Sequence, residues 1–400
     1  MTPARRYLSL ALIACVYVMD GYDINAMAMA VPRLEGALGL SPAAFGVVFS
    51  ALLIGMGIGA GAIAPLGDRF GRRPLIVFGV LAVALSTLAT STSGSIAEFL
   101  LWRLITGIGL GTCLANCTAM TAELAPPKLK ATLMSLTSAG IPLGLFAAGW
   151  FAPAVIGFGG WPALFVIPGL FAAVLAVLLG LTLPGERPVQ PENAAKVPQL
   201  ELLRAPAAFP FAIFAGALAL NALNLYMLNS WLPTVLPQAG FTLDQAAQLA
   251  GTAQLVGLGL AVALSVLIDR WRPGASMILT FAIIAGCFAA IGLLPPDPDR
   301  WTWLLLIGVG GASAAGLALM ALAPYLFPSR LLSSAVGAGV LVGRVGAIGG
   351  PLVGQAMLSA HVAPNTFLAA AAVPALISLL FCLGLPAALA MRRRGEAATA

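Results

Sequence analysis

Four charged residues that lie inside long apolar stretches are the residues of this sequence best placed to do chemistry. Asp20 and Asp23 stand three residues apart in the first stretch, so that on a helix they share one face. Arg103 lies in the fourth stretch and Arg344 in the eleventh. A charge in apolar surroundings is costly, and it is usually retained because it has a partner or a function.

These four residues suit the joint binding of an anion and a proton. Arginine offers a forked set of donors to a carboxylate. Burial and a neighbouring like charge both favour the protonated form of a carboxyl group. The hypothesis is that Asp20 or Asp23 carries a proton and that Arg103 and Arg344 bind an organic carboxylate. The alternative is a static ion pair, with Arg103 reaching outward towards the membrane surface.

The composition shows what must position these residues. Of 400 residues, 60% are hydrophobic and 8% are charged, and the mean hydropathy is +1.00. Soluble domains carry about 25% charged residues. A chain with so little polar material cannot cover a surface that faces water, and we therefore expect most of its outer surface to face lipid.

The apolar stretches predict an all-α membrane protein with twelve transmembrane helices in two pseudo-symmetric six-helix bundles. Each stretch is long enough to cross about 30 Å of hydrocarbon at 1.5 Å per residue. We divide the chain into an N-terminal bundle (1–183), a cytoplasmic linker (184–206) and a C-terminal bundle with a short tail (207–400). The predicted spans are 7–31, 42–64, 74–92, 95–122, 131–155, 162–183, 207–236, 246–268, 274–294, 301–326, 332–359 and 366–390.

Lysine and arginine predict the orientation, because loops rich in these residues stay in the cytoplasm. With the N-terminus inside, only Arg33 and Arg300 fall on the outer side. Both termini are then cytoplasmic, and the net charge of +6 reflects topology and not nucleic-acid binding. The inner side receives Arg5, Arg6, Arg69, Arg72, Arg73, Lys128, Lys130, Arg187, Lys196, Arg204, Arg270, Arg272, Arg330 and Arg392 to Arg394.

Other classes of function find little support. The five cysteines all fall inside predicted helices, which suggests neither a disulfide framework nor a metal site. No nucleophile triad, phosphate loop or output domain is visible, so that a membrane enzyme or a sensor is a weak alternative. We expect no metal and no cofactor.

Two predicted cytoplasmic loops are similar in sequence. GDRFGRRP (67–74) follows the second helix, and DRWRP (269–273) follows the eighth. The first loop resembles the signature of the major facilitator superfamily. Acids and arginines at such a loop can act as a charged latch, although a simple positive-inside anchor is the alternative. The residues that we assign to gating are Asp68, Arg69, Arg72, Arg73, Glu123, Asp269 and Arg270.

Further strings resemble one branch of that superfamily, the aromatic acid:proton symporters, among them the 4-hydroxybenzoate and 3-(3-hydroxyphenyl)propionate carriers. They include DGYD (20–23), Arg103 with the glycines after it, GIPLG (140–144), YMLNSWLPTVLPQA (226–239) and GRVGA (343–347). The resemblance implies proton-coupled uptake of a small aromatic carboxylate by alternating access. It also brings Asn116, Tyr226 and Asn229 into the expected substrate site.

The resemblance leaves alternatives open. A proton-driven exporter of drugs or metabolites, or an importer of a non-aromatic acid such as muconate, accounts for nearly as much. The expected location is a bacterial inner membrane, and the expected functional unit is a monomer. Trp231 is either part of a ring-stacking surface or an interfacial anchor.

Overall fold

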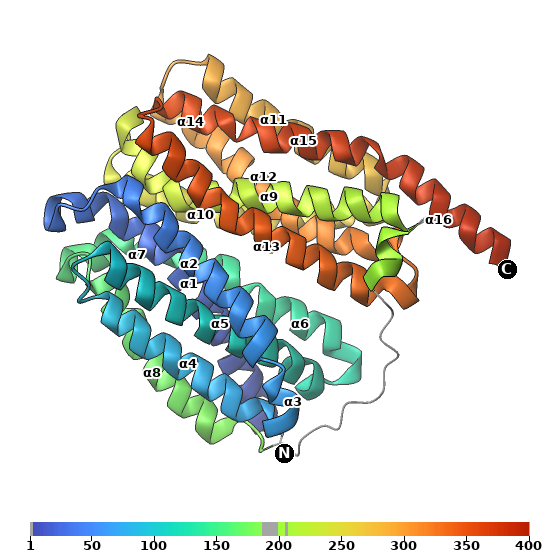
Figure 1. Cartoon of the computed structure of the whole chain (residues 1–400), viewed down its shortest axis with the longest axis horizontal. Helices are drawn as coiled ribbons and strands as arrows, with labels where there is room; N and C mark the ends of the chain where they lie inside the picture. The colour runs from blue at the N-terminus through green and yellow to red at the C-terminus, as the bar shows by residue number, and fades with distance from the viewer. Residues whose placement is uncertain (1–2, 186–198, 205–206, 400) are drawn as a thin grey trace. The chain divides into compact units, whose positions relative to one another are not determined.

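The computed structural model describes residues 3–185, 199–204 and 207–399, and these residues form helices joined by short connections (Figure 1). Twelve helices among them are long and apolar enough to cross a membrane, which confirms the predicted all-α membrane architecture. They span 3–38, 42–63, 72–90, 96–124, 132–159, 163–182, 208–239, 243–270, 273–293, 298–326, 330–359 and 364–392.

The first half contains six spans and, including the short α3 between the second and third spans, eight α-helices with several short turns of other helix types. The second span changes from α-helix to π-helix and ends at Ile63, two residues before Pro65, which cannot donate a backbone hydrogen bond. The elements are α1 (Pro3–Leu38), η1 (Pro42–Phe45), α2 (Gly46–Ile58), η2 (Gly59–Ile63), α3 (Leu66–Phe70), α4 (Arg72–Thr90), α5 (Ile96–Leu124), η3 (Pro127–Leu129), α6 (Lys130–Ser138), α7 (Gly140–Gly159) and α8 (Ala163–Thr182).

The second half contains the other six spans. Its elements are η4 (Gln199–Leu203), α9 (Ala208–Val235), η5 (Leu236–Ala239), α10 (Leu243–Arg270), α11 (Pro273–Leu293), α12 (Pro298–Leu326), α13 (Ser329–Ser359), α14 (Pro364–Ala370), α15 (Ala372–Leu383) and α16 (Leu385–Thr399).

The first helix is longer than its predicted span of 7–31. Hydropathy marks only the apolar part of a helix, whereas α1 continues through Pro32, Arg33 and Glu35 to Leu38. Arg33 donates to the carbonyl of Met29 at 3.1 Å. Most of the predicted linker lies outside the described residues, and Arg187 and Lys196 of the orientation argument lie there too.

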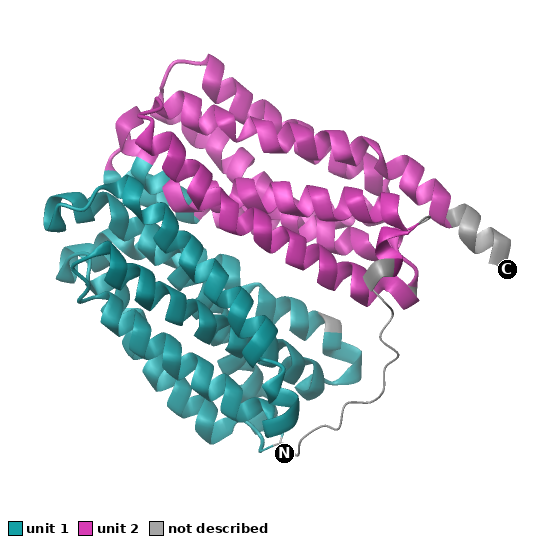
Figure 2. Cartoon of the chain, viewed as in Figure 1, with its two compact units in different colours: residues 1–193, 232–234, 243–251 teal, residues 194–231, 235–242, 252–400 magenta. Residues whose placement is uncertain are grey.

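Backbone contacts divide the chain into two compact units (Figure 2). Unit 1 comprises residues 1–193 with 232–234 and 243–251, and unit 2 comprises 194–231, 235–242 and 252–400. Unit 1 therefore holds α1 to α8 and the first turns of α10. Unit 2 holds most of α9, the rest of α10 and all of α11 to α16.

Glycines allow close backbone contact at equivalent places in the two units. In unit 1, a Cβ on Gly21 of α1 would stand 2.0 Å from the carbonyl oxygen of Ile141 on α7. In unit 2, a Cβ on Gly346 of α13 would stand 1.9 Å from the carbonyl oxygen of Ala219 on α9. Small residues at such crossings bring helix backbones together in membranes, where packing drives helix association.

Candidate functional site

Asp23 of α1 and Arg103 of α5 form a buried ion pair in unit 1. The Nη1 of Arg103 donates to Oδ2 of Asp23 at 2.6 Å and to the backbone carbonyl of Asp23 at 3.1 Å. The side chain of Asp23 is 2% exposed and that of Arg103 is 1% exposed. The two charges are therefore removed from solvent together, and each depends on the other for compensation.

Two further helices complete the surroundings of this pair. The hydroxyl of Thr87 on α4 donates to the other carboxylate oxygen of Asp23 at 3.2 Å. The ring of Phe165 on α8 lies 5.1 Å from Cζ of Arg103, within the range of a cation–π contact. Within the described structure, Nε and Nη2 of Arg103 make no hydrogen bond. The guanidinium therefore keeps donors that an incoming oxyanion can use.

Asp20 lies one turn before Asp23 on α1 and is 1% exposed. Its charge is close enough to Tyr17 and Cys113 to act on both of these side chains. Tyr17 in turn shares a hydrogen bond of 2.7 Å with the hydroxyl of Thr118 on α5. The two aspartates of α1 thus both lie near α5, but they have different neighbours.

Arg344, Tyr226 and Asn229 belong to unit 2. Arg344 stands midway along α13 and is half-buried, two residues before the glycine that contacts α9. Tyr226 and Asn229 are also half-buried and lie one turn apart on α9. Trp231 is fully buried and donates to the carbonyl of Pro351 at 3.0 Å, so that it is packed inside unit 2 and is not an interfacial anchor.

Asn116 makes its contacts with the break in the second span. Its Nδ2 donates to the carbonyl of Ala64 at 3.2 Å and to that of Thr112 at 2.9 Å. A Cβ on Gly67 would stand 2.0 Å from Oδ1 of Asn116, so that Gly67 leaves the room that this side chain occupies. Asn116 therefore ties α5 to the segment that leads to Asp68.

Three of the residues of unit 1 that we predict to act in gating, Asp68, Arg72 and Glu123, form an ion-pair network. Arg72, at the start of α4, binds the carboxylate of Glu123 at the end of α5 and lies 3.5 Å from Oδ1 of Asp68 on α3. Arg73 donates to the carbonyl of Gly180 on α8. Arg69 is exposed. The network links the ends of α3, α4 and α5.

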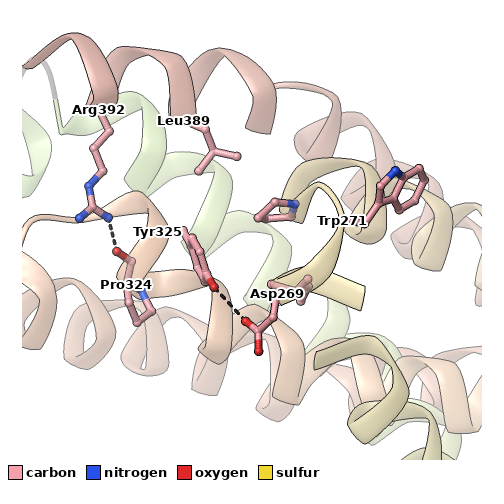
Figure 3. Close-up of a pocket in the computed structure, with 8 residues that line it drawn as sticks. Asp269, Trp271, Pro324, Tyr325, Leu389 and Arg392 are labelled. Atoms are coloured by element: carbon pink, nitrogen blue, oxygen red, sulfur yellow. Dashed lines mark hydrogen bonds between the residues drawn. The ribbon is translucent and has the colours of Figure 1, made fainter. Parts of the chain in front are cut away.

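In unit 2, Asp269, which we predict to act in gating, binds a hydroxyl in place of a charged partner. Tyr325, near the end of α12, donates to Oδ1 of Asp269 at 2.9 Å, and the two side chains point towards each other (Figure 3). They line a cavity of about 400 Å³, together with Trp271, which lies between α10 and α11, and with Arg392 of α16. Arg392 donates to the carbonyl of Pro324. Arg270 is exposed.

The two networks occupy equivalent positions. Glu123 is the residue before the last of α5, and Tyr325 is the residue before the last of α12. The loop at 269–273 lacks the Gly-Arg pair that supplies Arg72 in the loop at 67–74. Unit 1 therefore joins its helix ends through charges and unit 2 through a neutral donor.

Several partners were missed by sequence reasoning. Thr87 and Phe165 contact the buried pair, and Gln254 donates to Asn229 at 3.0 Å. Arg33 pairs with Asp244, in the first turn of α10, at 3.2 Å. No local pattern marks neutral partners such as Thr87. Among these partners, Asp244 alone carried a signal, since it is an acid on the predicted outer side, where Arg33 is one of two predicted bases.

The network of unit 1 leads to a first prediction. The Glu123→Gln variant should lower the rate of transport severalfold and leave KM and thermal stability nearly unchanged. Half-exposed ion pairs contribute only about 0–1 kcal/mol to stability, whereas a latch acts on the rate of opening and closing. Initial uptake rates and thermal unfolding in detergent measure both effects. Unchanged rates in this variant would assign Arg72 and Glu123 to anchoring alone.

The sequence of this chain is similar to those of known membrane transporters. The family model described as Major Facilitator Superfamily matches residues 13–351. A 3-(3-hydroxy-phenyl)propionate transporter of Escherichia coli is 31% identical, over 98% of this chain and 96% of that protein. A 4-hydroxybenzoate transporter of Pseudomonas aeruginosa is 32% identical over 86% of this chain and 84% of its own length. A gallate transporter of Pseudomonas putida is 29% identical over 99% and 93%. These matches confirm the resemblance inferred from the motifs.

The fold is also found among solved structures. A bacterial homologue of the human lysosomal transporter Spinster, crystallised in an inward-facing and unoccupied conformation, superposes with a TM-score of 0.81. The match covers 98% of this chain and 99% of that one at 18% identity. At this identity the comparison bears on the fold alone.

Proposed function

Because the chain belongs to the major facilitator superfamily and is a transporter, we propose that it carries a small aromatic carboxylate inward together with protons. The substrates are of the hydroxybenzoate or hydroxyphenylpropionate type. The observation that carries the proposal is the buried Asp23–Arg103 pair. The chain that holds this pair matches a gallate transporter and a 3-(3-hydroxy-phenyl)propionate transporter over nearly the whole length of each.

Charge balance at this pair supports coupling between anion and proton. Arg103 compensates the charge of Asp23 in surroundings from which water is excluded. A substrate carboxylate that binds the remaining donors of Arg103 places a second negative charge beside Asp23. The like charge favours protonation of the aspartate, so that substrate and proton bind together and leave together. Asp20, one turn away, offers a second carboxyl group for the same role.

The substrate residues of unit 2 complete the proposal. Arg344 is the only charged residue in the central part of the apolar stretches from 207 to 390, and we assign it to the substrate carboxylate. Tyr226 supplies a ring for stacking, and Asn229 supplies amide donors. We also assign Asn116 of unit 1 to the substrate site, where its amide donates to the carbonyl of Ala64.

Gating completes the transport cycle. We assign the networks around Arg72 and Asp269 to the cytoplasmic end, where they stabilise helix ends as the two six-helix halves, 1–183 and 207–400, alternate access. The protein works as a monomer in the bacterial inner membrane with both termini in the cytoplasm.

Uptake into proteoliposomes tests this function. The assay uses radiolabelled benzoate, 4-hydroxybenzoate, gallate, 3-(3-hydroxyphenyl)propionate, muconate and glucose, with and without an inward proton gradient. Accumulation of an aromatic acid that a protonophore abolishes is the expected result. If no acid accumulates under any gradient, an exporter becomes the better assignment. If muconate alone accumulates, the site serves a non-aromatic acid.

The role of Arg344 is tested in the same assay. Arg344→Gln should raise KM for the acid about 10- to 100-fold, because it removes charge-assisted hydrogen bonds worth about 1.5–3 kcal/mol. The control is Arg300→Gln, because Arg300 is an exposed arginine that pairs with Asp297 at 3.3 Å at a helix start. Equal KM values in the two variants would remove Arg344 from the substrate site.

A further inference from the structure

A chain of hydrogen bonds in unit 2 ends on Asn229. The hydroxyl of Ser313 on α12 donates to Oε1 of Gln254 on α10 at 3.3 Å. The Nε2 of Gln254 donates to Oδ1 of Asn229 on α9 at 3.0 Å. Gln254 is 1% exposed, whereas Ser313 and Asn229 are half-buried. Three helices are thus joined by polar side chains inside an apolar bundle.

Close packing of α10 on α12 holds the first two members in register. A Cβ on Gly257 would stand 2.8 Å from Cβ of Ser313, and a Cβ on Gly310 would stand 3.0 Å from the carbonyl oxygen of Ala253. Gly257 is three residues from Gln254, and Gly310 is three residues from Ser313. The same glycine contact that joins the helices therefore brings the glutamine and the serine together.

The direction of these hydrogen bonds determines which polar group Asn229 can offer to another molecule. An amide oxygen only accepts and an amide nitrogen only donates. Because Oδ1 of Asn229 accepts from Gln254, the group that remains for another molecule is its NH₂. Without a fixed partner, an asparagine side chain can turn over and present either its oxygen or its nitrogen. In the structure, Oε1 of Gln254 accepts from Ser313 and its Nε2 donates to Asn229, so that the oxygen of the Asn229 amide is the occupied end.

We propose that Gln254 and Ser313 are positioning residues that make Asn229 a hydrogen-bond donor, and that this donor recognises an oxygen substituent on the ring of the aromatic acid. This proposal rests on the proposed function, and it adds the chemical feature by which the site selects among such acids. The ring oxygen needs only to accept a hydrogen bond, so that an ether oxygen serves as well as a hydroxyl. Tyr226, one turn away on α9, is placed to contact the ring itself.

Selectivity tests this proposal better than total activity does. The ratio of kcat/KM for a ring-oxygenated acid to that for benzoate is measured with 3- and 4-hydroxybenzoate and with 3- and 4-methoxybenzoate. The wild type should prefer at least one oxygenated acid about tenfold, and its methoxy counterpart should retain the preference. In Gln254→Met, which keeps the length of the side chain but cannot hydrogen-bond, the ratio should fall to near one while benzoate uptake persists.

A pair of variants at Ser313 separates hydrogen bonding from packing. Ser313→Ala should reduce the ratio severalfold, and Ser313→Thr, which retains the hydroxyl, should preserve it. A purely structural role of Gln254 would lower the uptake of every acid by the same factor and leave the ratio unchanged, which would overturn the proposal. A wild type that takes up acids with no preference for ring oxygen would overturn it as well. A wild type that takes up no aromatic acid would overturn the proposed function, and this subsite with it.

Discussion

Proton-driven accumulation of the substrate is expected to fall by on the order of 100-fold in the Asp23→Asn variant. The amide has the shape of the carboxylate, its single oxygen can accept the hydrogen bond from Arg103, and its NH₂ can donate to the hydroxyl of Thr87. It cannot bind and release a proton, and so it cannot link substrate movement to the pH gradient. Accumulation of labelled substrate against its gradient in proteoliposomes measures the effect.

Exchange of substrate separates coupling from binding in this variant. Counterflow, in which labelled substrate exchanges for unlabelled substrate without a proton gradient, should persist in Asp23→Asn if the substrate site is intact. Normal accumulation in Asp23→Asn would show that this position carries no proton, and the corresponding variant of Asp20 would then take its place in the test.

Stability must be measured alongside transport, because Asp23→Asn leaves the buried charge of Arg103 without compensation. Removal of one member of a buried ion pair typically costs about 3–5 kcal/mol. Asp23→Asn should therefore lower the unfolding temperature in detergent, and the doubly neutral Asp23→Asn/Arg103→Gln variant should recover much of the loss. If the single variant unfolds at the wild-type temperature, the pair is better solvated than its burial implies.

Gly21→Ala is expected to prevent α1 from packing on α7. The new Cβ would stand 2.0 Å from the carbonyl oxygen of Ile141, a distance that no rotamer can relieve because the backbone fixes the position of Cβ and the oxygen is a backbone atom. Overpacking costs about 1–3 kcal/mol where side chains can adjust, and here the helices themselves must separate. The variant should yield little folded protein, as measured by the monodisperse fraction after purification.

The same helix provides the control. Gly36 also lies in α1, and a Cβ at this position would have no atom within 4 Å. Gly36→Ala should therefore express and transport as the wild type does. A Gly21→Ala protein that purifies and transports normally would mean that the contact with Ile141 loosens at little cost, and that the glycine between the two aspartates is not needed for packing.

The path of the chain through the membrane could be predicted from residue types alone. A lipid environment acts on each stretch of about 20 residues independently, because every apolar stretch must satisfy its own backbone hydrogen bonds as a helix. All twelve predicted spans overlap helices of the structure, and the main difference is at the ends of α1. Charged residues at mid-span were conspicuous for the same reason.

Which side chains meet was decided by tertiary structure. Either aspartate of α1 could have paired with Arg103, and the orientation of α1 against α5 brings Asp23 to it. The motif resemblance predicts that Asn116 binds substrate, and only the structure shows that its amide donates to the carbonyls of Ala64 and Thr112. The neutral residues Thr87, Gln254 and Ser313 carried no signal at all in a chain of apolar helices.

The physical reason is one of length scale. Hydropathy and charge act over whole helices and depend only on which residues follow one another. The spans and the mid-membrane charges can therefore be predicted from the sequence. Hydrogen bonds and ion pairs form over about 3 Å, and a partner is chosen by the rotation and separation of two helices. Contacts such as Gly21 with Ile141 and Gly257 with Ser313 set that geometry, and they exist only once the bundle has formed.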